Sequence, residues 1–183
     1  MAAWKSKRKI MQRYDTTADI YEERYTQEQK AKYKKALENI NIENAYVLDV
    51  GCGSGLFFRE AATQAGVVIG VDVSHKLLRK ANQQAKVLEN AFVVQADADH
   101  LPFMNKFFGA VFAFTVLQNV PKPEQTLGEL KRVAKSEGWV VVTGLKKAFP
   151  LEVFMDVLET SGLRLVSFVD EETINCYIAV LVA

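Results

Sequence analysis

Val47-Leu-Asp-Val-Gly-Cys-Gly-Ser-Gly55 joins a short apolar run to three closely spaced glycines. The apolar run predicts a buried β-strand over residues 46–50, and the glycines predict a tight loop that opens a helix. Glycines allow unusual backbone conformations and let backbone N–H groups approach a ligand closely. The pattern therefore indicates a ligand-binding loop or, taken alone, a tight strand-to-helix turn without a ligand.

Predicted strands and helices alternate around this loop. Strands are expected at residues 46–50, 67–73, 92–96, 110–115 and 139–143, and helices at 16–39, 56–65, 75–88, 121–135 and 150–160. Nearly unbroken apolar strands separated by helices are typical of a parallel sheet that is buried on both faces.

The end of the chain departs from this alternation. Two further strands, 163–169 and 176–182, are joined by a segment too short for a crossover helix, so we expect them to pair as an antiparallel hairpin. The predicted fold class is α/β. It is a doubly wound, mostly parallel, Rossmann-like sheet of seven strands, with helices on both faces and a C-terminal antiparallel hairpin.

Size and composition suit one cytoplasmic domain. Of the 183 residues 49% are hydrophobic, and 23 basic side chains nearly balance 22 acidic ones, so the net charge of +1 does not indicate a nucleic-acid binder. The two cysteines lie far apart, without metal-ligand spacing, and no apolar run approaches the roughly 20 residues that span a bilayer. We expect no metal site, an N-terminal helical segment over residues 1–40 and a ligand-binding domain over residues 41–183.

Acidic residues at the ends of strands narrow the class of ligand. Asp72 ends the second predicted strand, at roughly the 20-residue spacing from which a carboxylate can accept hydrogen bonds from ribose hydroxyls. A dinucleotide site would need glycine in place of Leu56. Asp49, inside the first strand, would repel a pyrophosphate and would suit a positively charged ligand. The loop therefore favours a cationic nucleoside over NAD.

These residues resemble the motifs of class I S-adenosylmethionine-dependent methyltransferases. Residues 47–55 are similar to the first motif of that family, 70–74 to the second and 95–103 to the third. Residues 108–115 resemble its fourth strand, and 130–139 resemble the helix and turn before its fifth. The similarity covers about residues 45–145 in order. Gly109 departs from the pattern, because many relatives carry an acid there.

The resemblance implies a site for S-adenosylmethionine as cofactor, with S-adenosylhomocysteine as product. Asp49 would face the ammonium group of the methionine part, Asp72 would hold the ribose hydroxyls, and Asp97 would bind the adenine amino group. Val73 and Ala98 would lie beside the adenine. The remaining residues would line the methionine and ribose parts, namely Gly51, Cys52, Gly53, Gly55 and Thr115.

Several other residues have two interpretations each. Tyr21 lies in a segment that resembles the N-terminal lid of small methyltransferases, where it would contact the cofactor, or it packs a helix on the sheet. The basic residues 5–13 form a solvated tail or contact RNA phosphates. His100 is an exposed loop residue or a general base. Gln118 and Asn119 either bind the methyl acceptor or cap the next helix.

The expected activity is methyl transfer from S-adenosylmethionine to a small metabolite, RNA or a protein. A non-catalytic S-adenosylmethionine-binding scaffold or sensor is the alternative, and no residue is assigned as catalytic. Residues 115–121 lack the Asn/Asp-Pro-Pro-aromatic pattern of enzymes that methylate glutamine or exocyclic amines of bases, which argues against those acceptors. By analogy with minimal relatives, we expect an exposed sheet edge to recruit a small activating protein subunit.

Overall fold

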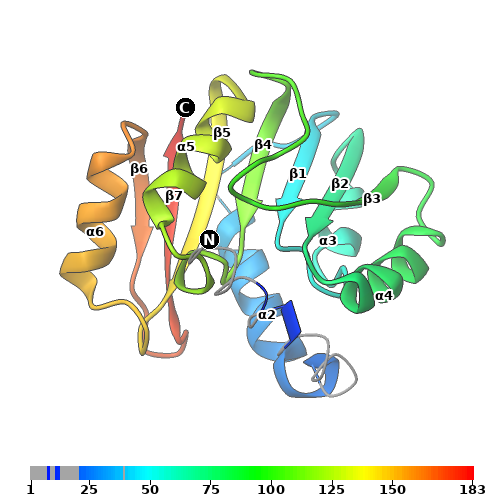
Figure 1. Cartoon of the computed structure of the whole chain (residues 1–183), viewed down its shortest axis with the longest axis horizontal. Helices are drawn as coiled ribbons and strands as arrows, with labels where there is room; N and C mark the ends of the chain where they lie inside the picture. The colour runs from blue at the N-terminus through cyan, green and yellow to red at the C-terminus, as the bar shows by residue number, and fades with distance from the viewer. Residues whose placement is uncertain (1–7, 9–10, 13–20, 39) are drawn as a thin grey trace.

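Seven strands form one sheet, in the order β3-β2-β1-β4-β5-β7-β6 (Figure 1). The chain is described by a computed structural model, which covers residues 8, 11–12, 21–38 and 40–183. The strands are β1 Tyr46–Val50, β2 Val67–Asp72, β3 Ala91–Gln95, β4 Phe108–Ala113, β5 Ala134–Leu145, β6 Arg164–Val169 and β7 Cys176–Val182. The first five pair in parallel, and β7 pairs antiparallel with both β5 and β6. The predicted sheet and its C-terminal hairpin are confirmed.

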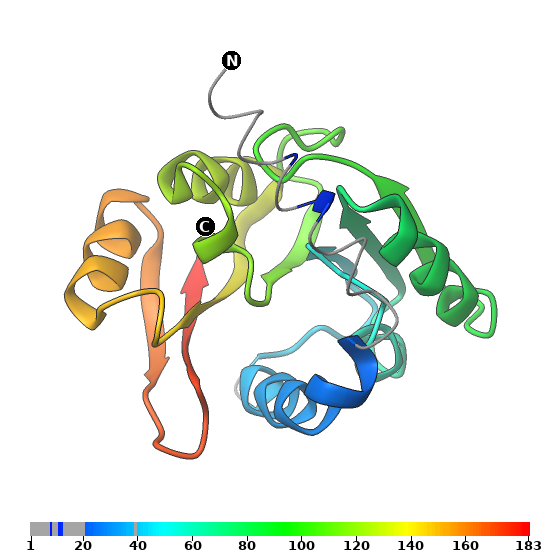
Figure 2. The same ribbon diagram turned by 60° about the horizontal axis from the view of Figure 1, so that its bottom comes forward.

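Successive residues of a strand point to opposite faces of the sheet, and helices cover both of these faces. On the side of Val47, the core includes residues of α2 Tyr21–Leu37, α3 Phe58–Ala62 and α4 His75–Ala85. On the side of Leu48, it includes residues of the short helix η1 Leu117–Asn119, of α5 Pro123–Val133 and of α6 Leu151–Thr160. Figures 1 and 2 show α4 and α6 at opposite ends of the sheet. No helix within the described ranges is long and apolar enough to cross a membrane.

Several predicted boundaries are wrong, each for a local reason. The helix predicted over 56–65 begins only at Phe58, because residues before it stay in turns that include a Gly55 N–H bond to the Cys52 oxygen. The fourth strand ends before Thr115, whose φ of 62° breaks the extended conformation. The fifth strand begins at Ala134, before the predicted residue 139, and its register with β4 shifts between Ala134 and Trp139, where Glu137 has a φ of 61°.

Gly70 sets how closely α3 approaches the sheet. A side chain there would place its Cβ 2.3 Å from Cζ of Phe58, the fully buried first residue of α3. The missing side chain lets the Phe58 ring lie against β2, directly after the glycine loop. The position of the loop therefore depends on this contact.

Gly70→Ala should destabilise the chain by roughly 1–3 kcal/mol, because the added methyl group overpacks the core against Phe58. The matched control is Gly128→Ala on the exposed side of α5, where an added Cβ meets nothing within 4 Å. The control should gain about 0.5–1 kcal/mol, since alanine favours a helix over glycine. Denaturant unfolding measures both variants, and equal effects would contradict the packing described here.

Candidate cofactor site

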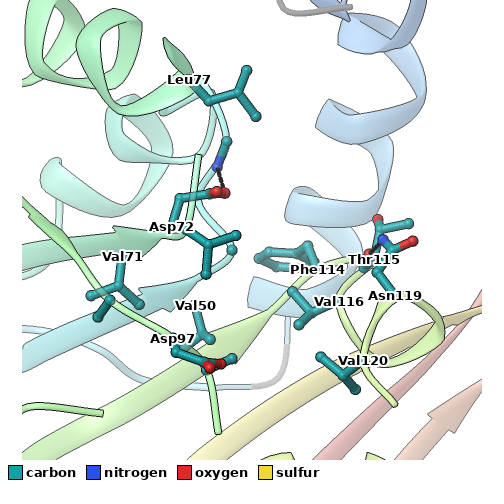
Figure 3. A pocket seen from close by; sticks show the side chains of 15 residues that line it. Val50, Val71, Asp72, Leu77, Asp97, Phe114, Thr115, Val116, Asn119 and Val120 are labelled. Atoms are coloured by element: carbon teal, nitrogen blue, oxygen red, sulfur yellow. Dashed lines mark hydrogen bonds between the residues drawn. The ribbon is translucent and has the colours of Figure 1, made fainter. Parts of the chain in front are cut away.

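Two cavities lie beside the glycine loop, at the carboxyl ends of β1, β2 and β4. The larger one, the main cavity, has a volume of about 720 Å³ including its open side. Figure 3 shows Asp72 and Leu77 on one side of it and Phe114, Val116 and Asn119 on the other. The smaller one, the small cavity, has about 300 Å³ and shares Gly51, Gly53 and Phe114 with the main cavity. Ligands of open α/β sheets bind at this edge.

Most predicted site residues meet at these cavities. The main cavity is lined by Gly51, Gly53, Asp72, Val73, Asp97, Ala98 and Thr115. Asp49 and Cys52 line the small cavity instead. Gly55 lines neither, and an added Cβ there would lie 2.9 Å from the Phe58 ring. The side chain of Tyr21 lies outside the described residues, as do Tyr14 and most of the basic segment 5–13.

The glycine loop does not present its backbone donors as predicted. The N–H groups of Gly51 and Cys52 donate to the Val71 oxygen at 2.8 and 3.0 Å, and that of Gly53 donates to Asp72 Oδ2 at 3.0 Å. The expectation that this loop offers these groups to a ligand is therefore wrong. Glycine is required at position 51 because φ is +70° and a Cβ would lie 2.5 Å from Val116 Cγ2.

Asp72 stabilises the backbone around it and also lines the main cavity. Its Oδ1 accepts from the Ser74 N–H at 2.8 Å, and its Oδ2 accepts from the Gly53 N–H. The same residue lines the main cavity, where its carboxylate is available to donors of a ligand. Asp97, two residues after β3, accepts from the Asp99 N–H at 3.0 Å through Oδ1 and lines the same cavity.

The small cavity is lined by buried side-chain oxygen atoms that can accept hydrogen bonds from a ligand. Asp49 is buried, and Gln29 Oε1 and Ser54 Oγ are buried without a hydrogen-bond partner among the described residues. Burial, together with the negative charge of Asp72, raises the pKa of Asp49 to about 8. A group with several donors and a positive charge would satisfy all three side chains. The ammonium group of S-adenosylmethionine has this chemistry, so these residues fit the predicted cofactor.

Apolar residues enclose the main cavity. Leu77, Phe114, Val116 and Val120 line it, and none of the four was named as a site residue from the sequence. Gln118 and Asn119 donate from their amide nitrogens to the Thr115 oxygen at 2.8 and 2.9 Å, so they brace the chain after β4.

Two further predictions concern His100 and a metal site. His100 is exposed and is not among the cavity-lining residues. Among the described residues, no cluster of three or more His, Cys, Asp or Glu side chains could hold a metal ion.

Asp49 should make stability depend on pH in the ligand-free chain. Its raised pKa means that the folded state holds a proton that the unfolded chain releases above its ordinary pKa of 3.8. The contribution of Asp49 to the free energy of unfolding should therefore fall from about pH 4 to about pH 8 and level off above. Denaturant unfolding at several pH values measures this slope. An equal slope in Asp49→Asn would contradict the raised pKa.

Comparison with known proteins identifies the family of the chain. Residues 48–142 match the methyltransferase domain family. The demethylmenaquinone methyltransferase of Staphylococcus saprophyticus is 34% identical over 119 residues, which cover 63% of this chain and 51% of that protein. The chain thus spans about half the length of this curated relative.

Solved structures share the fold at low sequence identity. The magnesium protoporphyrin IX methyltransferase of Synechocystis PCC 6803, solved with bound S-adenosylmethionine, has a TM-score of 0.79 at 17% identity, with 97% of this chain and 96% of that chain covered. A chain from the complex between the Haloferax volcanii Trm112 methyltransferase activator and a methyltransferase has a TM-score of 0.77 at 17% identity, with 93% and 97% covered. The chain belongs to the methyltransferase domain family and has the fold of class I S-adenosylmethionine-dependent methyltransferases.

Proposed function

We propose that this protein transfers the methyl group of S-adenosylmethionine to a quinol-type aromatic acceptor. The observation that carries the cofactor assignment is the set of carboxylates at the ends of three neighbouring strands. Asp49 on β1 lines the small cavity, while Asp72 on β2 and Asp97 after β3 line the main cavity. An acid at each of these places provides acceptors for an ammonium group, a ribose and an adenine amino group.

The residues of the two cavities would divide the cofactor between them. Asp72 would accept hydrogen bonds from the ribose hydroxyls, and Asp97 would accept one from the adenine amino group. Val73 and Ala98 would lie beside the adenine ring. Asp49, Gln29 and Ser54 would receive the ammonium group in the small cavity. Bound S-adenosylmethionine supplies an electrophilic methyl group on a sulfonium. The chain then has to orient the acceptor for in-line attack and exclude water.

The acceptor assignment rests on the curated relative and on the cavity walls. The similar Staphylococcus protein is named for demethylmenaquinone, so an aromatic quinol is the acceptor chemistry that the comparison favours. Phe114, Val116 and Val120 give the part of the main cavity after β4 an apolar wall. Such a wall suits a flat ring better than RNA or a charged peptide.

Asp97→Ala should weaken binding of S-adenosylhomocysteine by roughly 10- to 100-fold, because it removes the acceptor for the adenine amino group. Asp72→Ala should weaken it further, since the Gly53 N–H also loses its acceptor. Isothermal titration calorimetry measures both. Asp156→Ala, exposed on α6, is the matched control and should bind like wild type.

Transfer of a labelled methyl group completes this test. Reduced demethylmenaquinone, RNA, protein and metabolite fractions are offered to the folded wild-type chain together with S-adenosylmethionine. Label in the quinol is the expected result, and label in RNA or protein alone would overturn the acceptor assignment. Cofactor binding with no label in any fraction would favour the scaffold or sensor alternative. A folded chain that binds neither cofactor nor product would refute the cofactor site.

We also propose that a small activating subunit docks at the β3 edge of the sheet. Within the described residues, β3 pairs only with β2, so its outer edge can accept a further strand. Phe92 and Val94 point to the same face of β3 and are 54% and 36% exposed. Ala91 and Val93 pack in the core on the side of α4, so the exposed pair lies on the opposite face. The complex with an activator among the similar structures makes such a partner reasonable.

Phe92→Glu should weaken binding of a Trm112-type activator by at least about tenfold, or abolish it, because the substitution places a charge inside an apolar contact. Co-purification and calorimetry with the full chain measure this. Val166→Glu on β6, the opposite edge of the sheet, is the matched control at 47% exposure. Equal binding by both variants would place the partner elsewhere, and no binding by wild type would refute this partner class.

A further inference from the structure

Lys32 is a buried lysine directly behind the main cavity. It lies in α2 and is 2% exposed, an unusual degree of burial for a lysine. Its Nζ donates to Thr115 Oγ1 at 3.3 Å and to Cys176 Sγ at 3.7 Å. The side chain therefore reaches from α2 across the core to the end of β4 and the start of β7. None of the interactions that place the cofactor uses it.

Thr115 is held in a backbone conformation that threonine rarely adopts. Its φ is 62°, which is strained for a β-branched residue and needs strong local support. Its N–H donates to Thr143 Oγ1 at 2.8 Å, and its carbonyl oxygen accepts from the amides of Gln118 and Asn119. These bonds fix Thr115 at the wall of the main cavity, on the side away from Asp72 (Figure 3).

The hydrogen bond from Lys32 determines what Thr115 can offer. A lysine ammonium group only donates, so Thr115 Oγ1 accepts through a lone pair and its hydroxyl hydrogen must point elsewhere. No acceptor for that hydrogen is found among the described residues. The residue lines the main cavity, which leaves the cavity as the place for the acceptor. The positive charge behind the hydroxyl makes it a stronger donor.

We propose that Thr115 and Lys32 form an anchor for an anionic oxygen of a ligand in the main cavity. Thr115 donates to the oxygen, and Lys32 is the positioning residue that orients the hydroxyl and supplies positive charge. The anchor rests on the proposed function, and two oxygens of that reaction have the required chemistry. One is the carboxylate of the amino-acid part of S-adenosylmethionine. The other is a phenolate oxygen of the quinol acceptor.

Thr115→Val tests the anchor with little change in side-chain shape, and Thr115→Ser should restore what it loses. Calorimetry compares S-adenosylmethionine with decarboxylated S-adenosylmethionine, which lacks only the carboxylate. If the carboxylate is held, Thr115→Val weakens binding of the complete cofactor by about tenfold or more and leaves the decarboxylated form unchanged. If Thr115 instead holds the quinol acceptor, the affinities of Thr115→Val for both forms of the cofactor stay unchanged. KM for reduced demethylmenaquinone then rises, or kcat falls, by about tenfold.

Lys32→Met should reproduce the loss seen in Thr115→Val in a folded chain, as thermal unfolding checks. If Lys32→Met does not fold, the Thr115 variants alone decide. Binding and kinetics within about twofold of wild type in Thr115→Val would overturn the anchor, as would equal weakening of both cofactor forms. If the wild type does not methylate the quinol, only the cofactor carboxylate is left as the ligand of the anchor. An unchanged cofactor affinity in Thr115→Val then overturns the anchor. A wild type that binds no S-adenosylmethionine instead refutes the proposed function, so the two failures are distinguishable.

Discussion

The Asp72 carboxylate ties the glycine loop to the end of β2, and the whole site depends on that tie. It accepts the N–H groups of Gly53 and Ser74, while the Val71 oxygen accepts those of Gly51 and Cys52. The loop is thereby folded back on β2 instead of reaching into the cavity. The space between the ends of β1, β2 and β4 stays open, and Asp72 remains at its wall.

This arrangement also determines the charge that the site accepts. Phosphate-binding loops turn free N–H groups toward an anion, whereas four of the N–H groups in this loop are occupied internally. Asp49 lies buried nearby, and the charge of Asp72 adds to the cost of ionising it. A ligand with a cationic end relieves that cost and supplies the donors that Gln29 Oε1 and Ser54 Oγ need. These features favour a sulfonium cofactor with an ammonium group over a dinucleotide.

Patterns that are local in sequence were predictable, and contacts between distant segments were not. The mostly parallel sheet with its final hairpin follows from the apolar runs, and the position of Asp72 follows from motif spacing. The position of Asp97 follows from the family resemblance. Lys32 and Gln29 were missed, because a mostly polar helix does not reveal which polar side chains are buried. The direction of the loop N–H groups was also missed, because it depends on how the end of β2 packs beside the loop.

A crystal structure with bound S-adenosylhomocysteine tests the central claim most directly. We expect ribose hydroxyls within hydrogen-bond distance of Asp72 and the adenine amino group at Asp97. We expect the ammonium group among Asp49, Gln29 and Ser54. A ligand bound outside both cavities, or held in the main cavity without contact to Asp72, would contradict it.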